Sequence, residues 1–180
     1  MERFVLVFNM TLFQNKYRVE STRLPYWDYS SDGWYFVTIC TKNREEHFGK
    51  IQNYFMGLSN IGCAAAKFWN EIPNHFPFTR LDEWVVMPNH VHGIIIIDNH
   101  IVETRDLASL QWDENEFGPL KKNSLQSIIH GFKSSITRWC NVNNHKNFAW
   151  QPRFHDRIIR NEKELNEIRK YIYYNPQMWN

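Results

Sequence analysis

The chain has 180 residues, 43% of them hydrophobic and 16% aromatic, with a formal net charge of +2 at pH 7. This length fits one domain with an appendage, and the composition supplies enough apolar side chains for a core. No apolar run approaches the length of a membrane span, and no signal peptide is expected at the N-terminus. Three scattered cysteines without a C-x-x-C pair argue against a disulfide framework or zinc knuckle and fit a reducing cytoplasm.

Hydrophobic periodicity and turn residues divide the chain into an N-terminal appendage, residues 1–16, and a single domain, residues 17–180. The elements expected in chain order are a strand over Trp34–Thr41, a hairpin or short strand over Phe48–Gly57, a helix from Ser59 closed by Pro73, strands over Leu81–Pro88 and His90–Asp98, a polar loop over Asp98–Asn123, a helix capped by Ser124, a strand over Arg153–Arg160, and a helix from Asn161 to about Asn175, stopped by Pro176.

The order of these elements predicts the fold. Strand, helix, strand, strand, helix, strand is the split β-α-β pattern, and one more helix follows it. We therefore expect an α+β fold, ferredoxin-like or RRM-like, with an antiparallel four-stranded sheet, two helices on one face and a C-terminal helix. The second face of the sheet is then free for a ligand or for that extra helix.

Charged residues are unevenly distributed along the chain. Residues 121–170 contain eleven Lys or Arg against four Asp or Glu, whereas residues 98–116 contain six acids against the single Arg105. A polyanion bound on one face would explain this asymmetry. Scattered solvated charge is the alternative explanation.

The segment VVMPNHVHGIIII, residues 85–97, places two histidines inside an aliphatic run. Because side chains alternate along a strand, His90 and His92 point to one face and Val91 to the other. Their Cα atoms are then roughly 6.5–7 Å apart, which suits two ligands of one cation. A solvated strand face is the ordinary explanation for such a pair, but the aliphatic flanks indicate a central strand, where polar side chains need partners. A third ligand would have to come from elsewhere in the chain.

The last helix ends in the sequence YIYYNP. Tyr171 and Asn175 are four residues apart, so they lie on one edge of its buried stripe and point the same way. A phenol can act as a nucleophile, and a carboxamide oxygen is a neutral ligand for a divalent cation. Tyrosines at a helix end more often serve packing, and Tyr173 and Tyr174 are assigned to packing here.

Three stretches of the chain together resemble the REP-associated tyrosine transposases of the HUH endonuclease superfamily. They are WDYSSDGWYFVTICTKNREEHFG, WVVMPNHVHGIIII and WQPRFHDRIIRNEKELNEIRKYIYYNP. The resemblance covers about residues 17–179. H-x-H alone is a weak signal, but the ordered set M-P-N-H-x-H, W-Q-x-R-F and Y-I-x-x-N-P is specific.

The resemblance implies a metal-dependent endonuclease and strand-transferase that acts on single-stranded DNA at hairpin-forming repeats. His90, His92 and Asn175 would be the ligands of Mg²⁺ or Mn²⁺, and Tyr171 would be the nucleophile that forms a 5′-phosphotyrosine intermediate. Because imidazole pairs are unusual ligands for Mg²⁺, we expect Mn²⁺ to bind more tightly. The DNA would lie in the bacterial cytoplasm with the nucleoid, without a membrane partner, and the protein would be a monomer or a homodimer.

Basic and aromatic side chains are the expected DNA contacts. They are Arg23, Trp27, Lys121, Lys122, Lys133, Arg153, Arg157 and Arg160, with Tyr29 and Trp150 as further stacking candidates. His155 and Asp156 would either support the site or pair with each other, and the pairing is preferred. The other function considered is a non-catalytic, domesticated protein that binds hairpin or single-stranded nucleic acid on an RRM-like sheet. A zinc hydrolase is disfavoured because no further histidine has a familiar ligand spacing.

Overall fold

The computed structural model describes residues 26–104 and 121–179 of the chain. Predictions that concern residues 1–25 and 105–120 lie outside this part. They include the appendage over residues 1–16, the DNA contact at Arg23 and most of the acidic loop. Within the described part, no helix combines the length and the apolar character needed to cross a bilayer.

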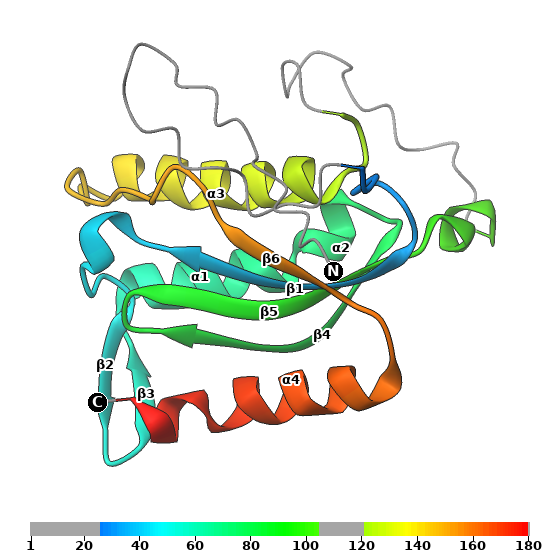
Figure 1. Ribbon diagram of the computed structural model, residues 1–180. Coiled ribbons are helices and arrows are strands. Elements are labelled where there is room, and N and C mark those ends of the chain that lie inside the picture. The colour runs from blue at the N-terminus through cyan, green and yellow to red at the C-terminus, as the bar shows by residue number, and fades with distance from the viewer. Residues whose placement is uncertain (1–25, 105–120, 180) are drawn as a thin grey trace, which may run out of the picture.

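An antiparallel sheet in the order β4-β5-β1-β6 forms the middle of the domain, with a separate two-stranded ribbon beside it (Figure 1). The strands of the sheet are β1 (Gly33–Cys40), β4 (Thr79–Met87), β5 (His90–Ile97) and β6 (His155–Ile159), and those of the ribbon are β2 (Gly49–Gln52) and β3 (Phe55–Leu58). The aliphatic strand β5 is central, with β1 and β4 as antiparallel neighbours. The corner at Pro88-Asn89 therefore joins adjacent antiparallel strands, as predicted.

Helices cover both faces of the sheet (Figure 1). They are α1 (Asn60–Asn70), α2 (Ile72–His75), α3 (Leu125–Val142) and α4 (Glu162–Tyr174), with short 3-10 helices η1 (Lys42–Arg44), η2 (Asn99–Thr104) and η4 (Asn175–Met178). The side chains of Ser59, Ser124 and Asn161 cap the starts of α1, α3 and α4 by accepting a backbone N–H three residues later. The chain order β1-α1-β4-β5-α3-β6 followed by α4 confirms the predicted α+β fold.

One proline position and one loop differ from the prediction, whereas α4 ends at Tyr174, next to the predicted end. The first long helix ends at Asn70, and Pro73 lies within α2, because proline is tolerated in the first turn of a helix, where its missing N–H costs no bond. Pro176 lies in the first turn of η4 for the same reason. The polar loop predicted from Asp98 begins with η2 over its described residues.

The sheet separates two apolar clusters of unequal size. The larger one joins the inner faces of α1 and α3 to residues such as Val91 and Ile95 of β5. The smaller one packs Ile168 and Ile172 of α4 against residues such as Ile94. Because side chains alternate along β5, its even-numbered residues face α4, and this places His90 and His92 on the α4 side.

Candidate active site

The histidine pair lies at the start of β5, directly after the Pro88-Asn89 corner. The two imidazole rings are 4.3 Å apart between centroids, and both residues are buried, at 6% and 5% of their full exposure. His92 also stacks on Phe36 of the neighbouring strand β1, with 5.3 Å between ring centroids. The structure thus confirms that His90 and His92 share one face and lie in the centre of the sheet.

Each imidazole is held in place through its Nδ1 atom. Nδ1 of His90 is 2.8 Å from Oδ1 of Asn89. The Asn89 amide donates through Nδ2 to the carbonyl of Arg44 at 3.1 Å, which fixes its oxygen towards the histidine. An amide oxygen only accepts hydrogen bonds, so His90 Nδ1 carries the proton and its Nε2 presents a lone pair. Nδ1 of His92 is similarly occupied, 2.8 Å from the hydroxyl of Thr38.

Burial keeps both imidazoles neutral. It lowers the pKa of His90 to about 4, and the charge of Arg44 contributes in the same direction. It lowers the pKa of His92 to about 3, with a further contribution from His90. A neutral imidazole is the form that binds a metal ion. The pair is therefore ready to bind a cation at pH 7 without first losing protons.

Tyr171 of α4 reaches this pair from across the smaller apolar cluster. Its hydroxyl is 3.3 Å from Nε2 of His92, and its ring contacts Phe36 edge-on at 6.1 Å between centroids. The residue keeps 43% of its exposure, so a substrate can reach the phenol from solvent. Nε2 of His90 is buried and has no hydrogen-bond partner in the described part of the chain. A buried polar atom without a partner is costly, and a bound cation would satisfy it.

Asn175 ends α4 and begins η4, where it is buried at 8% of its full exposure. Further along this segment, the Trp179 ring lies 5.9 Å from the ring of His90, so the chain after α4 runs beside the histidine pair. No three His, Cys, Asp or Glu side chains converge on a metal site within residues 26–104 and 121–179. A cation at the two histidines would therefore take its other ligands from amide, hydroxyl, water or substrate oxygens.

A charged pair fixes the helix that carries the tyrosine. Arg169 donates from Nε and Nη2 to the two carboxylate oxygens of Asp82 on β4, at 2.7 and 2.6 Å. These hydrogen bonds hold the pKa of Asp82 below its usual value. Leu165, Ile168 and Ile172 on the same helix are buried, as the sequence predicted. The helix therefore has both an apolar and a charged attachment close to Tyr171.

The predicted DNA contacts lie on several elements of the fold, and some of them have protein partners. Lys121 pairs with Asp28 at 2.6 Å, and Lys133 lies on the α3 side, where it donates to the carbonyl of Gln151 at 2.6 Å. Burial lowers the pKa of Lys133 to about 8. Trp27 is partly exposed and donates to the hydroxyl of Tyr35 at 3.1 Å. Lys122 and Arg153 are exposed.

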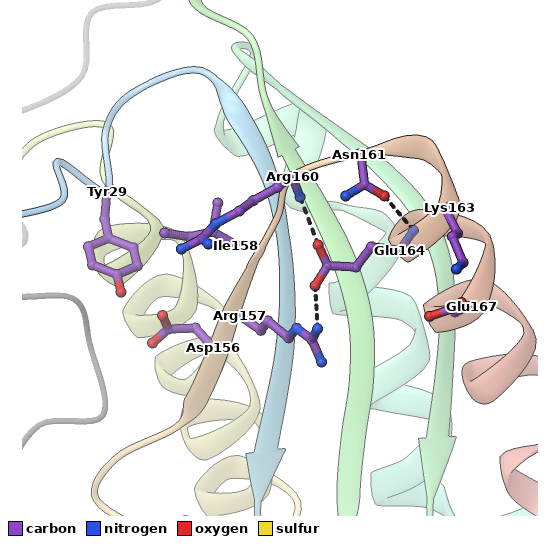
Figure 2. A pocket seen from close by; sticks show the side chains of 9 residues that line it. All are labelled: Tyr29, Asp156, Arg157, Ile158, Arg160, Asn161, Lys163, Glu164 and Glu167. Atoms are coloured by element: carbon purple, nitrogen blue, oxygen red, sulfur yellow. Dashed lines mark hydrogen bonds and ion pairs between the residues drawn. The ribbon is translucent and has the colours of Figure 1, made fainter.

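Arg157 and Arg160 line a pocket of about 610 Å³ between β6 and the start of α4 (Figure 2). Arg157 forms an ion pair with Glu164, which also accepts from the backbone N–H of Arg160 at 3.0 Å. Figure 2 shows Lys163 and Glu167 on the neighbouring turn of α4. The pocket thus mixes both signs of charge, which the count of basic residues did not foresee.

Two smaller predictions about side chains are wrong, those for Tyr29 and for the pair His155 and Asp156, whereas Trp150 could equally have been a core anchor and is one. Tyr29 is buried at 7% of its exposure and cannot stack on a base. Trp150 is only partly exposed and packs on Phe132 and Phe148 of the core, because its indole N–H is satisfied by the carbonyl of Lys133. His155 and Asp156 do not pair, because neighbouring residues of a strand point to opposite faces.

Two tyrosines assigned to packing lie on the surface, and two polar residues of the site were not predicted. Tyr173 and Tyr174 are exposed, at 64% and 47%, and pack edge-on against each other. Asn89 and Thr38 orient the histidines, and sequence reasoning missed both. Asn89 directly precedes the H-x-H motif, which is a usable signal. Thr38 has no such signal, since only the pairing of β1 with β5 brings it opposite His92.

Comparison with known proteins extends this description. No protein-family model matches the chain. It is similar to an uncharacterized protein from Haemophilus influenzae, with 40% identity over 161 residues that cover 88% of either chain. It is also similar to a REP-associated tyrosine transposase from Escherichia coli K12, with 27% identity over 148 residues, 82% of this chain and 68% of the other. A REP-associated tyrosine transposase solved in complex with a REP hairpin matches with a TM-score of 0.57 and 23% identity, over 88% of this chain and 73% of that one.

The fold defines the structural class of the chain. It is an α+β domain whose sheet and C-terminal helix match those of the hairpin-bound structure. The similarity in sequence then narrows the class. The chain is a homologue of the REP-associated tyrosine transposases.

Proposed function

We propose that the protein is a metal-dependent endonuclease and strand-transferase for single-stranded DNA beside hairpin-forming repeats, with Tyr171 as its nucleophile. The observation that carries this proposal is the contact between the Tyr171 hydroxyl and Nε2 of His92, at 3.3 Å, next to the unpartnered Nε2 of His90. This reaction requires a nucleophile beside ligand atoms that can hold a metal ion. A purely structural tyrosine would not need this arrangement.

The two histidines fit a divalent cation because burial keeps both rings neutral, which is the form that binds a metal. Nδ1 of His90 donates to Asn89, so the lone pair of its Nε2 is available to a metal, and Thr38 positions the ring of His92 through Nδ1. His90 and His92, with Asn175 as the third ligand, would hold Mg²⁺ or Mn²⁺, which supplies Lewis-acid stabilisation of the charge that develops on the phosphate oxygens.

The proposed cleavage of the DNA strand is a phosphoryl transfer to Tyr171. The Tyr171 oxygen loses its proton to solvent and forms a bond to the scissile phosphorus, while the bond from phosphorus to the 3′-oxygen breaks. The 3′-oxygen takes up a proton and leaves as a free hydroxyl, and the 5′ side of the DNA stays attached to Tyr171. The energy of the phosphodiester is kept in the phosphotyrosine, so a second 3′-hydroxyl can attack it and join two strands.

The substrate class is inferred from the family. One relative is a transposase solved in complex with a REP hairpin. We infer that this chain also binds a DNA hairpin and cuts the single strand that flanks it. Arg153, Arg157 and Arg160, which flank or belong to the edge strand β6, are the proposed phosphate contacts on that path. Lys133 is used by backbone carbonyls and is a weaker candidate.

A covalent-adduct assay tests the proposal. The protein is mixed with a hairpin-bearing oligonucleotide and Mn²⁺, and adducts that survive SDS are resolved on a gel. Wild type should form the adduct, and Tyr171→Phe should form none while it binds the oligonucleotide with unchanged affinity. Tyr173→Phe, two residues along the same helix, is the matched control and should behave as wild type.

Two outcomes would contradict the proposal. An adduct in the Tyr171→Phe variant would show that another residue is the nucleophile. Tight hairpin binding without any wild-type adduct, across divalent metals, would instead show a non-catalytic hairpin-binding protein.

A further inference from the structure

His155 lies on the same face of the sheet as the histidine pair, although it is more than sixty residues away in the sequence. Thr38 of β1 pairs with His92 of β5 on one side and with His155 of β6 on the other. Directly paired residues on neighbouring strands project to the same face. His92, Thr38 and His155 therefore form one row across the sheet, on the side covered by α4.

The spacing along this row suits a phosphate group held between its two histidines. Two strand spacings separate His92 from His155, so their Cα atoms are about 10 Å apart. The residue between them is Thr38, whose short side chain is already engaged with His92 at 2.8 Å. The Tyr171 hydroxyl also contacts His92, at 3.3 Å, so the proposed nucleophile lies beside this row.

His155 is available to a ligand. It is exposed on β6, which is the edge strand of the sheet formed by the described residues (Figure 1). In the described part of the chain its side chain makes no hydrogen bond or ion pair. The next residue on this face, Arg157, is engaged by Glu164 in an ion pair. His155 is thus the polar group on this part of β6 that no protein partner has taken.

We propose that His155 donates a ring N–H to a non-bridging oxygen of the phosphodiester that Tyr171 attacks, on the side of that phosphate away from His92. This inference rests on the proposed function and adds a substrate contact to it. An imidazole has an N–H donor in either neutral tautomer and when protonated, so the contact does not depend on its charge. The ligand is the phosphodiester of a single DNA strand that crosses the β6 edge of the sheet.

Single-turnover kinetics of adduct formation, at saturating hairpin oligonucleotide and Mn²⁺, test the inference. Loss of one such donor typically lowers a rate by about 10²-fold, and we expect that loss for His155→Ala. His155→Gln keeps an N–H donor and should recover most of the rate. Hairpin affinity should change by less than about twofold, since one phosphate contact among several is removed.

Asp156→Asn is the matched control, because Asp156 is the next residue and faces the opposite side of the sheet, opposite Val37. It should form the adduct at the wild-type rate. A His155→Ala rate within about twofold of wild type, or a His155→Gln rate no higher than that of His155→Ala, would overturn the inference while the proposed function stands. Failure of the wild-type protein to form any adduct would overturn both.

Discussion

The two faces of the central sheet are built for different purposes from the same strands. Towards α1 and α3, β5 presents Val91, Gly93 and Ile95, all fully or nearly fully buried in a large apolar cluster. Towards α4, the same strand presents His90 and His92 before it becomes apolar at Ile94. The first face supplies most of the burial that stabilises the fold. The second face buries polar side chains. Burying them costs free energy, and we attribute this cost to a functional site.

Hydrogen bonds and neutral rings keep the free-energy cost of burying the two histidines small. The imidazoles remain neutral, their Nδ1 atoms are bonded, and of the two Nε2 atoms only that of His90 is left without a hydrogen-bond partner among the described residues. One buried unsatisfied atom costs about 1–3 kcal/mol. The account therefore predicts that changes on the α4 face alter function with little loss of stability, and that changes on the opposite face do the reverse.

The largest functional effect is expected at the histidines themselves. His90→Gln and His92→Gln each remove an imidazole ligand, so Mn²⁺ affinity should fall by at least about 10²-fold and metal-dependent adduct should be lost. The free energy of unfolding of the metal-free protein should change by less than about 1 kcal/mol, because the chain keeps its apolar clusters. Calorimetric titration and urea denaturation measure the two quantities.

The same titrations compare metals in the wild-type protein. Mn²⁺ should bind more tightly than Mg²⁺, because neutral nitrogen ligands suit it better. Equal affinities for the two ions, or variants that bind Mn²⁺ like wild type, would place the cation elsewhere.

Gly93→Ala tests the opposite face of the same strand. A β-carbon at residue 93 would overlap the ring of Trp69, which is fully buried and cannot move freely. We expect a loss of about 1–3 kcal/mol in the free energy of unfolding, with Mn²⁺ affinity of the folded protein retained. Gly57→Ala is the control, since its β-carbon would meet only a backbone oxygen at 3.5 Å. Equal stability of the two variants would show that this face is less tightly packed than described.

Asn89→Ala tests the support of the metal ligands. The substitution leaves His90 in place but removes the amide oxygen that holds its Nδ1 proton at 2.8 Å. Mn²⁺ affinity should fall by about tenfold, because loss of a group that orients a ligand typically costs 10- to 100-fold. Asn70→Ala is the control, because Asn70 is an exposed residue of α1 whose amide bonds only to the backbone of its own helix. Wild-type affinity in Asn89→Ala would mean that the imidazole is oriented by packing alone.

The smallest effect is expected at the attachment of α4 to β4. Asp82→Asn should lower the free energy of unfolding at pH 7 by about 1 kcal/mol, since Arg169 is 40% exposed and solvent screens the pair. The pKa of Asp82 is lowered in the folded protein by Arg169, so the unfolded chain binds the proton more readily. The stabilisation is therefore present above the ordinary value of 3.8 and is lost as the pH falls through the lowered pKa. Wild type and Asp82→Asn should differ in urea denaturation at pH 7 and converge towards pH 2; a difference independent of pH would refute this assignment.

Hydrophobic periodicity in the sequence predicted many of these features. Alternation along β5 placed His90 and His92 together on one face, and helical spacing identified the apolar face of α4. Alternation also separates His155 from Asp156, and the pairing expected between them neglected it. Periodicity describes one helix or strand at a time, and it was sufficient to predict which face of β5 and of α4 each side chain lies on.

Contacts between distant segments could not be predicted in the same way. Thr38 reaches His92 only through the register of β1 and β5, which no local pattern states. Two basic residues of the last third have partners that no local pattern indicates, since Arg157 pairs with Glu164 and Lys133 donates to backbone carbonyls. Counting charged residues along the sequence does not show which face of the protein a charge lies on. It also does not show which residue of opposite charge pairs with it.

The most direct test of the central claim is to identify the tyrosine that carries the DNA. Wild-type adduct is digested with protease and nuclease, and the modified peptide is sequenced by mass spectrometry. The account predicts a nucleotide phosphate on Tyr171, even though Tyr173 and Tyr174 are at least as exposed, at 64% and 47% against 43%. Modification of Tyr173 or Tyr174 instead would contradict it, because only Tyr171 contacts the imidazole of His92 among the described tyrosines.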